Sequence, residues 1–360
     1  MVLEDSWKKT NANVPKSKDS SLHWVDLDLP AARADLAEWF ARFARDLPWR
    51  STRSVYRTVV SEFMLQQTRV ATVLPYFDRW MAAFPGFSEL AKADEEEVLR
   101  HWQGLGYYSR ARNIHRLAQE IEVSGVPTSR VGWKKLPGIG DYSSAAIASL
   151  ASGEAVAVVD GNVVRVLSRI ASNERTWTSS AEAVKAFTPL ADAFLDPEQP
   201  GVHNEALMEL GALVCFPRSP LCTVCPLLRH CSAASKGIAE SLPRILKAAK
   251  TKRTIDRIWA VVDGSILLRK APSAEKRLAG MFELPRKEDL ASDWSVAKNP
   301  MTKKKRGIGN EIITETIFQV TKIGKETSPP KLRWVSLDEL EDISLSGPHR
   351  RWILELLEIS

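Results

Sequence analysis

The pattern of apolar and polar positions divides the 360-residue chain into two parts. Apolar residues recur at helical spacing through roughly the first 235 residues, and nothing before residue 227 has the alternation of a strand-rich region. The first helix is predicted from Pro30, with Leu36, Trp39, Phe40 and Phe43 on its apolar face. Further helices are predicted over residues 54–73, 75–84, 87–92, 94–102, 110–124, 142–151, 163–172, 180–194 and 204–213. This part is therefore expected to be all-α.

The pattern changes after residue 254. Two apolar runs, residues 258–262 and 265–268, flank an Asp263-Gly264 pair, which is a strong hairpin signal. Further strands are predicted over residues 311–320 and 331–335, and a final helix over residues 348–357. The basic run at residues 303–306 lies between strands, where a solvated loop is a commoner explanation than a phosphate contact. These elements predict a small α+β domain of roughly 105 residues.

Four segments follow from this division. They are a flexible tail (residues 1–28), a helical domain (29–234), a basic interdomain linker (235–254) and the C-terminal domain (255–360). No apolar run approaches the roughly 20 residues that span a bilayer, and the polar N-terminus lacks the apolar core of a signal peptide. We therefore expect a cytoplasmic protein without membrane association, in a reducing setting where cysteines are thiols or metal ligands.

Composition and charge change this picture little. The hydrophobic content of 44% is ordinary for a globular protein. The net charge of +6 favours an acidic partner, although a mildly basic cytoplasmic protein fits nearly as well.

The four cysteines of the chain lie close together, as Cys215, Cys222, Cys225 and Cys231. Four thiolates at this spacing fit either one tetrahedral zinc ion or one cubane iron–sulfur cluster. The spacing lacks the paired Cys-x2-Cys units of a zinc ribbon, which favours the cluster.

A glycine turn and two carboxylates are the candidates for chemistry. Leu-Pro-Gly-Ile-Gly at residues 136–140 separates two helical patterns, so its backbone amides could approach a phosphate, or it could be only a turn. Asp160 follows 20 residues after Gly140. Glu62 lies in an apolar stretch, where a solvent-exposed edge position is the better interpretation. If Glu62 is half-buried, its pKa rises and it can hold a proton near neutral pH.

A second glycine-rich stretch lies at residues 104–108. There Gly-Leu-Gly-Tyr-Tyr could form a wedge that enters a base stack, or a turn with packing aromatics.

Residues 47–231 resemble the helix-hairpin-helix DNA glycosylases with a four-cysteine cluster, and they look most like the adenine DNA glycosylases of the MutY family. The matching motifs are Leu-Pro-Trp-Arg (47–50), Ser-Glu-Phe-Met-Leu-Gln-Gln-Thr (61–68), Gly-Leu-Gly-Tyr-Tyr (104–108) followed by Arg110, Arg112 and Asn113, the glycine turn (136–140), Val-Asp-Gly-Asn-Val (159–163), Asn-Glu-Ala-Leu (204–207) and the cysteine spacing. The family removes adenine mispaired with 8-oxoguanine or guanine, in base excision repair.

The resemblance implies a two-lobed, mainly α glycosylase domain with a [4Fe-4S] cluster in the loop of residues 215–231. It further implies a monomer in the bacterial cytoplasm or nucleoid, acting on double-stranded DNA with A:8-oxoguanine or A:G mispairs. The target adenine would be flipped out of the duplex.

The resemblance also assigns roles to residues. Glu62 would protonate adenine at N7, and an ionised Asp160, supported by Asn162, would stabilise the cation at the sugar. Tyr142 stands where bifunctional relatives carry a Schiff-base lysine, so hydrolysis without strand nicking is expected. The residues expected to contact substrate or DNA are Arg50, Leu65, Gln67, Thr68, Leu105, Tyr107, Gly138, Gly140, Glu205 and Arg218.

The C-terminal domain resembles the family's Nudix-like 8-oxoguanine-recognition domain through Met-Phe-Glu-Leu-Pro at residues 281–285. No Nudix catalytic box of clustered glutamates is present in the sequence. Where the family usually has Phe-Ser-His, this chain has Ile308-Gly309-Asn310. Asn310 could donate one hydrogen bond but cannot replace all three residues, so a weaker 8-oxoguanine preference is expected.

Two other functions are compatible with parts of this pattern. One is an endonuclease III-like glycosylase and lyase, against which Tyr142 argues. The other is a non-catalytic DNA-damage-binding protein, against which the presence of both Glu62 and Asp160 argues.

Overall fold

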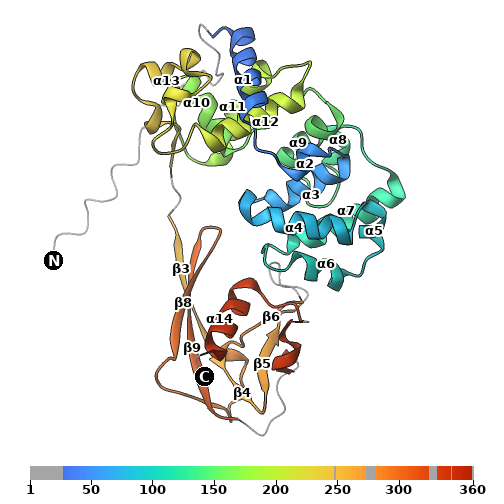
Figure 1. Ribbon diagram of the computed structural model, residues 1–360. Coiled ribbons are helices and arrows are strands. Elements are labelled where there is room, and N and C mark those ends of the chain that lie inside the picture. The colour runs from blue at the N-terminus through green and yellow to red at the C-terminus, as the bar shows by residue number, and fades with distance from the viewer. Residues whose placement is uncertain (1–26, 247–248, 273–279, 324–330, 342, 359–360) are drawn as a thin grey trace, which may run out of the picture. The chain divides into compact units, whose positions relative to one another are not determined.

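The computed structural model describes residues 27–246, 249–272, 280–323, 331–341 and 343–358 (Figure 1). The expected flexible tail lies almost wholly outside these residues. Backbone contacts divide the chain into two compact units: the first comprises residues 1–44 and 155–246, and the second comprises residues 45–154 and 247–360. The first unit is therefore assembled from two separate stretches of sequence. None of the helices in the described ranges is long and apolar enough to cross a membrane.

The first unit is a helical bundle followed by the cysteine loop. Its longer helices are α1 (Leu29–Phe43), α10 (Gly161–Ile170), α11 (Ser180–Phe194) and α12 (Pro200–Leu213). Short elements follow the cysteines: η1 (Cys222–Val224), η2 (Leu228–His230), α13 (Ser232–Ser235) and η3 (Ala239–Ser241). Strand β1 (Thr176–Trp177) pairs in parallel with β2 (Arg244–Ile245), so part of the expected linker is paired with the helical bundle. The buried core includes Leu36, Trp39, Val163, Leu167, Phe187, Phe194, Leu207 and Leu210.

Helix α1 begins as predicted, because Pro30 occupies its first turn and the Asp28 side chain accepts a hydrogen bond from Ala31 N. The placement of Phe43 on the apolar face is wrong, since this residue is 60% exposed. Helix α12 begins at Pro200 rather than at residue 204 for the same reason that α1 begins at its proline.

The second unit begins with helices that pack around α3. They are α2 (Pro48–Ser51), α3 (Val55–Leu65), α4 (Val70–Ala83), α5 (Phe87–Lys92), α6 (Glu95–Trp102), α7 (Ser109–Ser124), α8 (Arg130–Trp133) and α9 (Asp141–Ser152). The prediction of one helix over residues 54–73 is wrong. Gln67 adopts a left-handed φ of 57°, so α3 ends at Leu65 and α4 starts at Val70, with Pro75 inside it.

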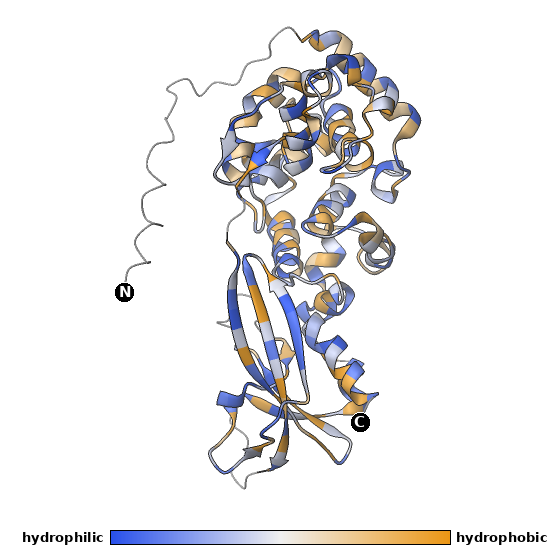
Figure 2. Cartoon of the chain, turned by 90° about the vertical axis from the view of Figure 1, so that its left-hand side faces the viewer, coloured by the Kyte–Doolittle hydropathy of each residue, from blue (hydrophilic) through white to orange (hydrophobic). Residues whose placement is uncertain are grey.

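The C-terminal part of the second unit contains two small sheets. In one, β3 (Thr251–Trp259) pairs in parallel with β9 (Glu311–Lys322), and β7 (Ser295–Val296) and β8 (Thr302–Ile308) pair antiparallel to β9. In the other, β5 (Ser265–Lys270) pairs with β4 (Val261–Val262), β6 (Phe282–Glu283) and β10 (Leu332–Ser336). Helix α14 (Gly347–Leu357) contributes Trp352, Ile353 and Leu356 to the core. Figure 2 shows hydrophobic and hydrophilic residues mixed along the long strands, as expected for sheets with one covered face.

The predicted hairpin is confirmed, with Asp263 and Gly264 both at positive φ between β4 and β5. The prediction of a solvated loop at residues 303–306 is wrong, because these residues form most of β8. Lys303 and Lys305 are exposed, whereas Lys304 and Arg306 are half-buried and pair with Glu355 and Glu315. Strand β3 also begins inside the expected linker.

Candidate active site and cysteine pocket

Asp160 sits at the start of α10, where an extended segment meets the helix. Its Oδ1 accepts a hydrogen bond from Val163 N at 2.8 Å, the contact of a helix N-cap. The preceding segment is held by the Asn204 side chain of α12, which accepts from Val158 N and donates to Val156 O, both at 2.9 Å. The backbone before Asp160 is thus fixed at two points, and the carboxylate is fixed by the helix that it begins.

Asn162 links Asp160 to a buried arginine. Its Nδ2 donates to Asp160 Oδ2 at 2.9 Å, and its Oδ1 accepts from Arg165 Nη2 at 2.9 Å. Burial raises the pKa of Asp160, while the hydrogen bonds from Val163 and Asn162 and the charge of Arg165 oppose that rise. Asn162 therefore connects the Asp160 carboxylate to Arg165 through two hydrogen bonds.

One face of α10 holds the beginning of the cysteine loop. Arg165 donates to Cys215 O at 2.7 Å and to Gly211 O at 2.8 Å. Arg169, four residues further on, donates to Cys215 Sγ at 3.1 Å and to Phe216 O at 2.7 Å. Sequence reasoning missed both arginines, although their spacing puts them on the same side of a helix.

The four cysteines line one pocket together with Arg169 and Leu221. Burial raises the pKa of the Cys225 thiol to about 12 and also raises that of Cys231, so a deprotonated set needs a cationic partner in the pocket. Within the described residues, no three or more His, Cys, Asp or Glu side chains are gathered in an arrangement that could hold a metal ion.

The cysteine loop is also attached to α1. The Asp35 carboxylate accepts from Arg229 Nε and Nη2, each at 2.8 Å, and lies 2.8 Å from His230 Nε2. Arg218, the predicted phosphate contact on this loop, is exposed.

Glu62 belongs to the second unit, whereas Asp160 belongs to the first. Glu62 is only 7% exposed, so the interpretation of it as a solvent-facing edge residue is wrong. Helix α3 is buried on nearly all sides, and its neighbours Ser61, Phe63 and Met64 are buried as well. The Glu62 carboxyl group is therefore shielded from bulk water.

The glycine turn lies between α8 and α9. Gly138 has a φ of +76°, and a Cβ there would lie 2.6 Å from Asn113 Cβ, so both conformation and space demand glycine. Gly140 is the N-cap of α9, next to Asp141, which pairs with Lys134. Tyr142 is half-buried in the first turn of α9, and the neighbouring Ser143 accepts from Gln66 Nε2 at 3.2 Å.

The other predicted contact residues differ in exposure. Gln67 is exposed and Tyr107 is 48% exposed, and both have left-handed backbones. Leu105 is 5% exposed, so little of its side chain is accessible. Four further predicted contact residues are less exposed than Gln67 and Tyr107. Leu65 and Arg50 are half-buried, and Glu205 is buried. The Thr68 hydroxyl accepts a hydrogen bond from Arg110.

Comparison with known proteins defines the class. Residues 60–189 match the family described as the HhH-GPD superfamily base excision DNA repair protein. The structure of a thermostable thymine-DNA glycosylase aligns with 58% of this chain and 97% of that chain, with a TM-score of 0.52 and 28% identity. The helical glycosylase fold expected from the motifs is therefore confirmed, together with an additional sheet-containing C-terminal region.

The particular family follows from the relatives. An adenine DNA glycosylase of Buchnera aphidicola subsp. Baizongia pistaciae (strain Bp) is 30% identical over 347 residues, covering 89% of this chain and 95% of the relative. This chain belongs to the adenine DNA glycosylase family. The adenine DNA glycosylase of Mus musculus is 43% identical over 231 residues, and the match spans 60% of this chain and 45% of the mouse protein. The chain thus spans about half the length of its mammalian relatives.

Proposed function

We propose that this protein is a monofunctional adenine DNA glycosylase of base excision repair. It hydrolyses the N-glycosidic bond of adenine mispaired with 8-oxoguanine or guanine in double-stranded DNA. The observation that carries this proposal is the environment of its two carboxyl groups: Glu62 is buried in a helix, and Asp160 is held by Val163 and Asn162 at a helix N-terminus.

The two groups have different tasks in the proposed reaction. The target adenine is first flipped from the stack, because its reacting bond is shielded there. Glu62 then donates a proton to adenine N7, which makes the base a better leaving group. The ionised carboxylate of Asp160 stabilises the positive charge that develops at the sugar, as in glycoside hydrolysis. The resemblance to the family assigns Arg50 and Glu205 to adenine binding.

Tyr142 limits the reaction to hydrolysis. A phenol cannot form an imine with the sugar, so the route to strand cleavage lacks its nucleophile. Borohydride should therefore trap no covalent complex with abasic DNA, and a trapped complex would favour the glycosylase-lyase alternative.

We further propose that Cys215, Cys222, Cys225 and Cys231 hold a [4Fe-4S] cluster. A single zinc ion needs its four sulfurs gathered within about 2.3 Å of one centre, whereas a cubane binds each thiolate on a separate iron atom. The four thiols line one pocket, and their spacing lacks the paired Cys-x2-Cys units of a zinc ribbon, which favours the cubane. The cluster would fold the loop and present Arg218 to phosphate, with no part in bond cleavage.

The C-terminal region is proposed to be the Nudix-like domain that meets the base opposite adenine. Asn310 lies at the turn between β8 and β9, and its Nδ2 donates to Ala249 O at 2.7 Å. One of its two amide hydrogens is thus used within the protein. This supports a weak preference for 8-oxoguanine over guanine, which adenine release from the two duplexes would measure.

The function is tested by single-turnover adenine release from an A:8-oxoguanine duplex. The Glu62→Gln variant should bind the duplex like the wild type and lose about 10²–10⁴-fold in excision rate, the usual contribution of a general acid. Glu120→Gln makes the same change at an exposed position of α7 and should leave the rate unchanged. An unchanged rate in Glu62→Gln would remove Glu62 from the acid role. Wild-type binding without release would favour the non-catalytic binding protein.

A further inference from the structure

A buried arginine, Arg110, lies between two loops that carry predicted DNA contacts. The α3–α4 loop comprises residues 66–69 and includes Gln67 and Thr68. The α6–α7 loop comprises residues 103–108 and includes Leu105 and Tyr107. Arg110 is in the first turn of α7 and is 5% exposed.

Arg110 forms hydrogen bonds with the C-terminal end of α3 and with the loop that follows it. Its Nη1 donates to Phe63 O and Met64 O, both at 2.8 Å, and to Gln66 O at 2.6 Å. The last carbonyls of a helix have no helical donors and carry the negative end of the helix dipole. The guanidinium therefore caps α3 from another helix, next to the turn that contains Glu62.

The same guanidinium holds the second loop. Its Nη2 donates to Leu105 O and Gly106 O at 3.1 Å, and to Thr68 Oγ1 of the first loop at 3.1 Å. Its central carbon lies 5.2 Å from the Trp102 ring centroid and 5.5 Å from that of Tyr107, within reach of a cation–π contact. One side chain thus binds both loops and the exposed aromatic ring of one of them.

The partners of Arg110 are unusual for a buried cation. Among the described residues they are carbonyl and hydroxyl oxygens and aromatic rings, with no carboxylate. Burial lowers the pKa of Arg110 to about 10, so it stays charged at neutral pH. Burying a charge is costly and would be poorly repaid if only packing were required, since an apolar side chain could fill the space.

Both loops also contain a strained residue. Gln67 has a φ of 57° and Tyr107 a φ of 50°, a conformation that costs about 1 kcal/mol or more for a residue other than glycine. Such conformations persist only where the surroundings determine them, and the bonds of Arg110 to Gln66 O and Gly106 O lie directly beside both residues.

We propose that Arg110 is a positioning residue that fixes the α3–α4 loop and the α6–α7 loop in one arrangement, so that Gln67 and Tyr107 meet the duplex together. It also holds the last turn of α3, which carries Glu62. The role in excision rests on the proposed function, whereas the fixing of the loops does not.

The experiment compares Arg110→Lys and Arg110→Met with two controls. Lysine keeps the charge but loses the planar fork, and methionine keeps most of the volume without the charge. Arg112→Met removes a charge from the same helix at a residue that pairs with Glu95. Tyr56→Phe removes a buried hydroxyl that donates to Phe84 O at 2.7 Å, which lowers stability outside the two loops.

Hydrogen exchange of the free protein is the first measurement. Amides of residues 66–69 and 103–108 should exchange at least about tenfold faster in both Arg110 variants, because several charge-assisted hydrogen bonds are lost. Tyr56→Phe should lower the melting temperature and leave exchange in these loops unchanged. Loops that exchange no faster in the Arg110 variants than in Tyr56→Phe would overturn the proposal.

Single-turnover excision is the second measurement. Both Arg110 variants should lose about 10²-fold in rate, as expected for a misplaced catalytic group, while Arg112→Met keeps the wild-type rate. Wild-type excision in Arg110→Lys would overturn the positioning role, because charge alone would then suffice. If the wild type releases no adenine, the proposed function fails, and loop exchange still decides whether Arg110 fixes the loops.

Discussion

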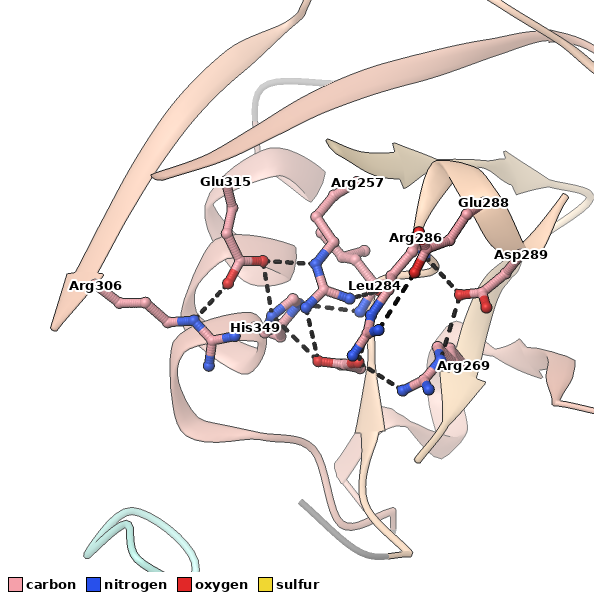
Figure 3. Close-up of polar contacts among 10 residues, drawn as sticks. Arg257, Arg269, Leu284, Arg286, Glu288, Asp289, Arg306, Glu315 and His349 are labelled. Carbon is pink, nitrogen blue, oxygen red and sulfur yellow. Dashed lines mark hydrogen bonds and ion pairs between the residues drawn. The ribbon is translucent and has the colours of Figure 1, made fainter. Parts of the chain in front are cut away.

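Replacing Arg257 with methionine should strongly destabilise the C-terminal part of the protein. Arg257 is fully buried at the centre of an ion network (Figure 3). Its Nε lies 2.6 Å from Glu315 Oε2, its Nη2 lies 2.8 Å from Glu283 Oε2, and its Nη1 donates to Leu284 O at 2.7 Å. The substitution removes one charge and leaves two buried carboxylates behind.

The structure sets the size of the effect. Breaking a buried ion pair by removing one partner costs about 3–5 kcal/mol. Here Glu283 keeps Arg269 at 2.8 Å, and Glu315 keeps Arg306, so neither carboxylate is left alone. We therefore expect the lower end of that range, about 3 kcal/mol. Arg257→Lys keeps the charge but loses hydrogen bonds, and should cost about 1–2 kcal/mol.

The loss should also depend on pH. Burial alone would raise the pKa of Glu315, but contacts with His349 and the charges of Arg257 and Arg306 lower it from 4.5 to about 2. A carboxylate with a lowered pKa contributes stability that is complete above 4.5 and disappears as the pH falls toward about 2. Because Arg257→Met removes part of this contribution, wild type and variant should become more similar in this window.

Hydrogen exchange of the β3 and β9 amides measures the local stability. At neutral pH, the local free energy of unfolding should differ clearly between wild type and Arg257→Met. A difference below about 1 kcal/mol would refute the reasoning, since it is smaller than the cost of breaking a buried ion pair. A difference that stays constant from neutral pH to below 4.5 would refute the assignment of this energy to Glu315.

Three further predictions follow from other sites. Burial lowers the pKa of His349 below 6.5, so the unfolded chain binds a proton that the folded protein does not, and stability should fall as the pH drops below 6.5. His349→Phe should reduce that slope in pH-dependent unfolding, and the remainder should come from His203, whose pKa burial lowers to about 4. Asn204→Ala removes the hydrogen-bond partners of Val158 N and Val156 O, and it should lower the free energy of unfolding by about 2 kcal/mol and slow adenine release. An unchanged rate of adenine release would show that the segment of residues 156–158 does not position Asp160. Cys222→Ser should lose bound iron, visible absorbance and DNA affinity, and retained colour would show that the ligands are wrongly assigned.

Elements with local signals could be predicted from the sequence. Helices α5 and α11 have the predicted bounds, and the turn at Asp263 and Gly264 lies where its two residues require it. In these segments the apolar period, the caps and the turn residues all favour the same structure. The family could also be predicted, because each of its motifs is a short stretch of consecutive residues.

Features that depend on distant partners could not be predicted. Apolar residues continue through the break between α3 and α4, and the bonds that fix the loop there come from Arg110, more than 40 residues away in the chain. The sequence of the basic run in β8 is typical of a solvated loop. In the structure, Glu315 and Glu355 pair with Arg306 and Lys304, and these partners are distant in the sequence. The burial of Glu62 likewise depends on helices packed around α3, which the pattern of α3 alone does not contain.

The surroundings of Asp160 show why an aspartate is needed at this position. Arg165 donates to Asn162 Oδ1, which leaves Asn162 Nδ2 as the group that faces Asp160 Oδ2. The hydrogen bonds therefore run in one direction, from arginine to asparagine to aspartate, and only an acceptor fits at their end. An asparagine at position 160 could still cap α10 through its side-chain oxygen. Its amide NH2 group would then face Asn162 Nδ2, which is also a donor. The network that binds the cysteine loop to α10 thus also favours the ionised carboxylate that the proposed reaction requires, and it opposes the rise in the pKa of Asp160 that burial causes.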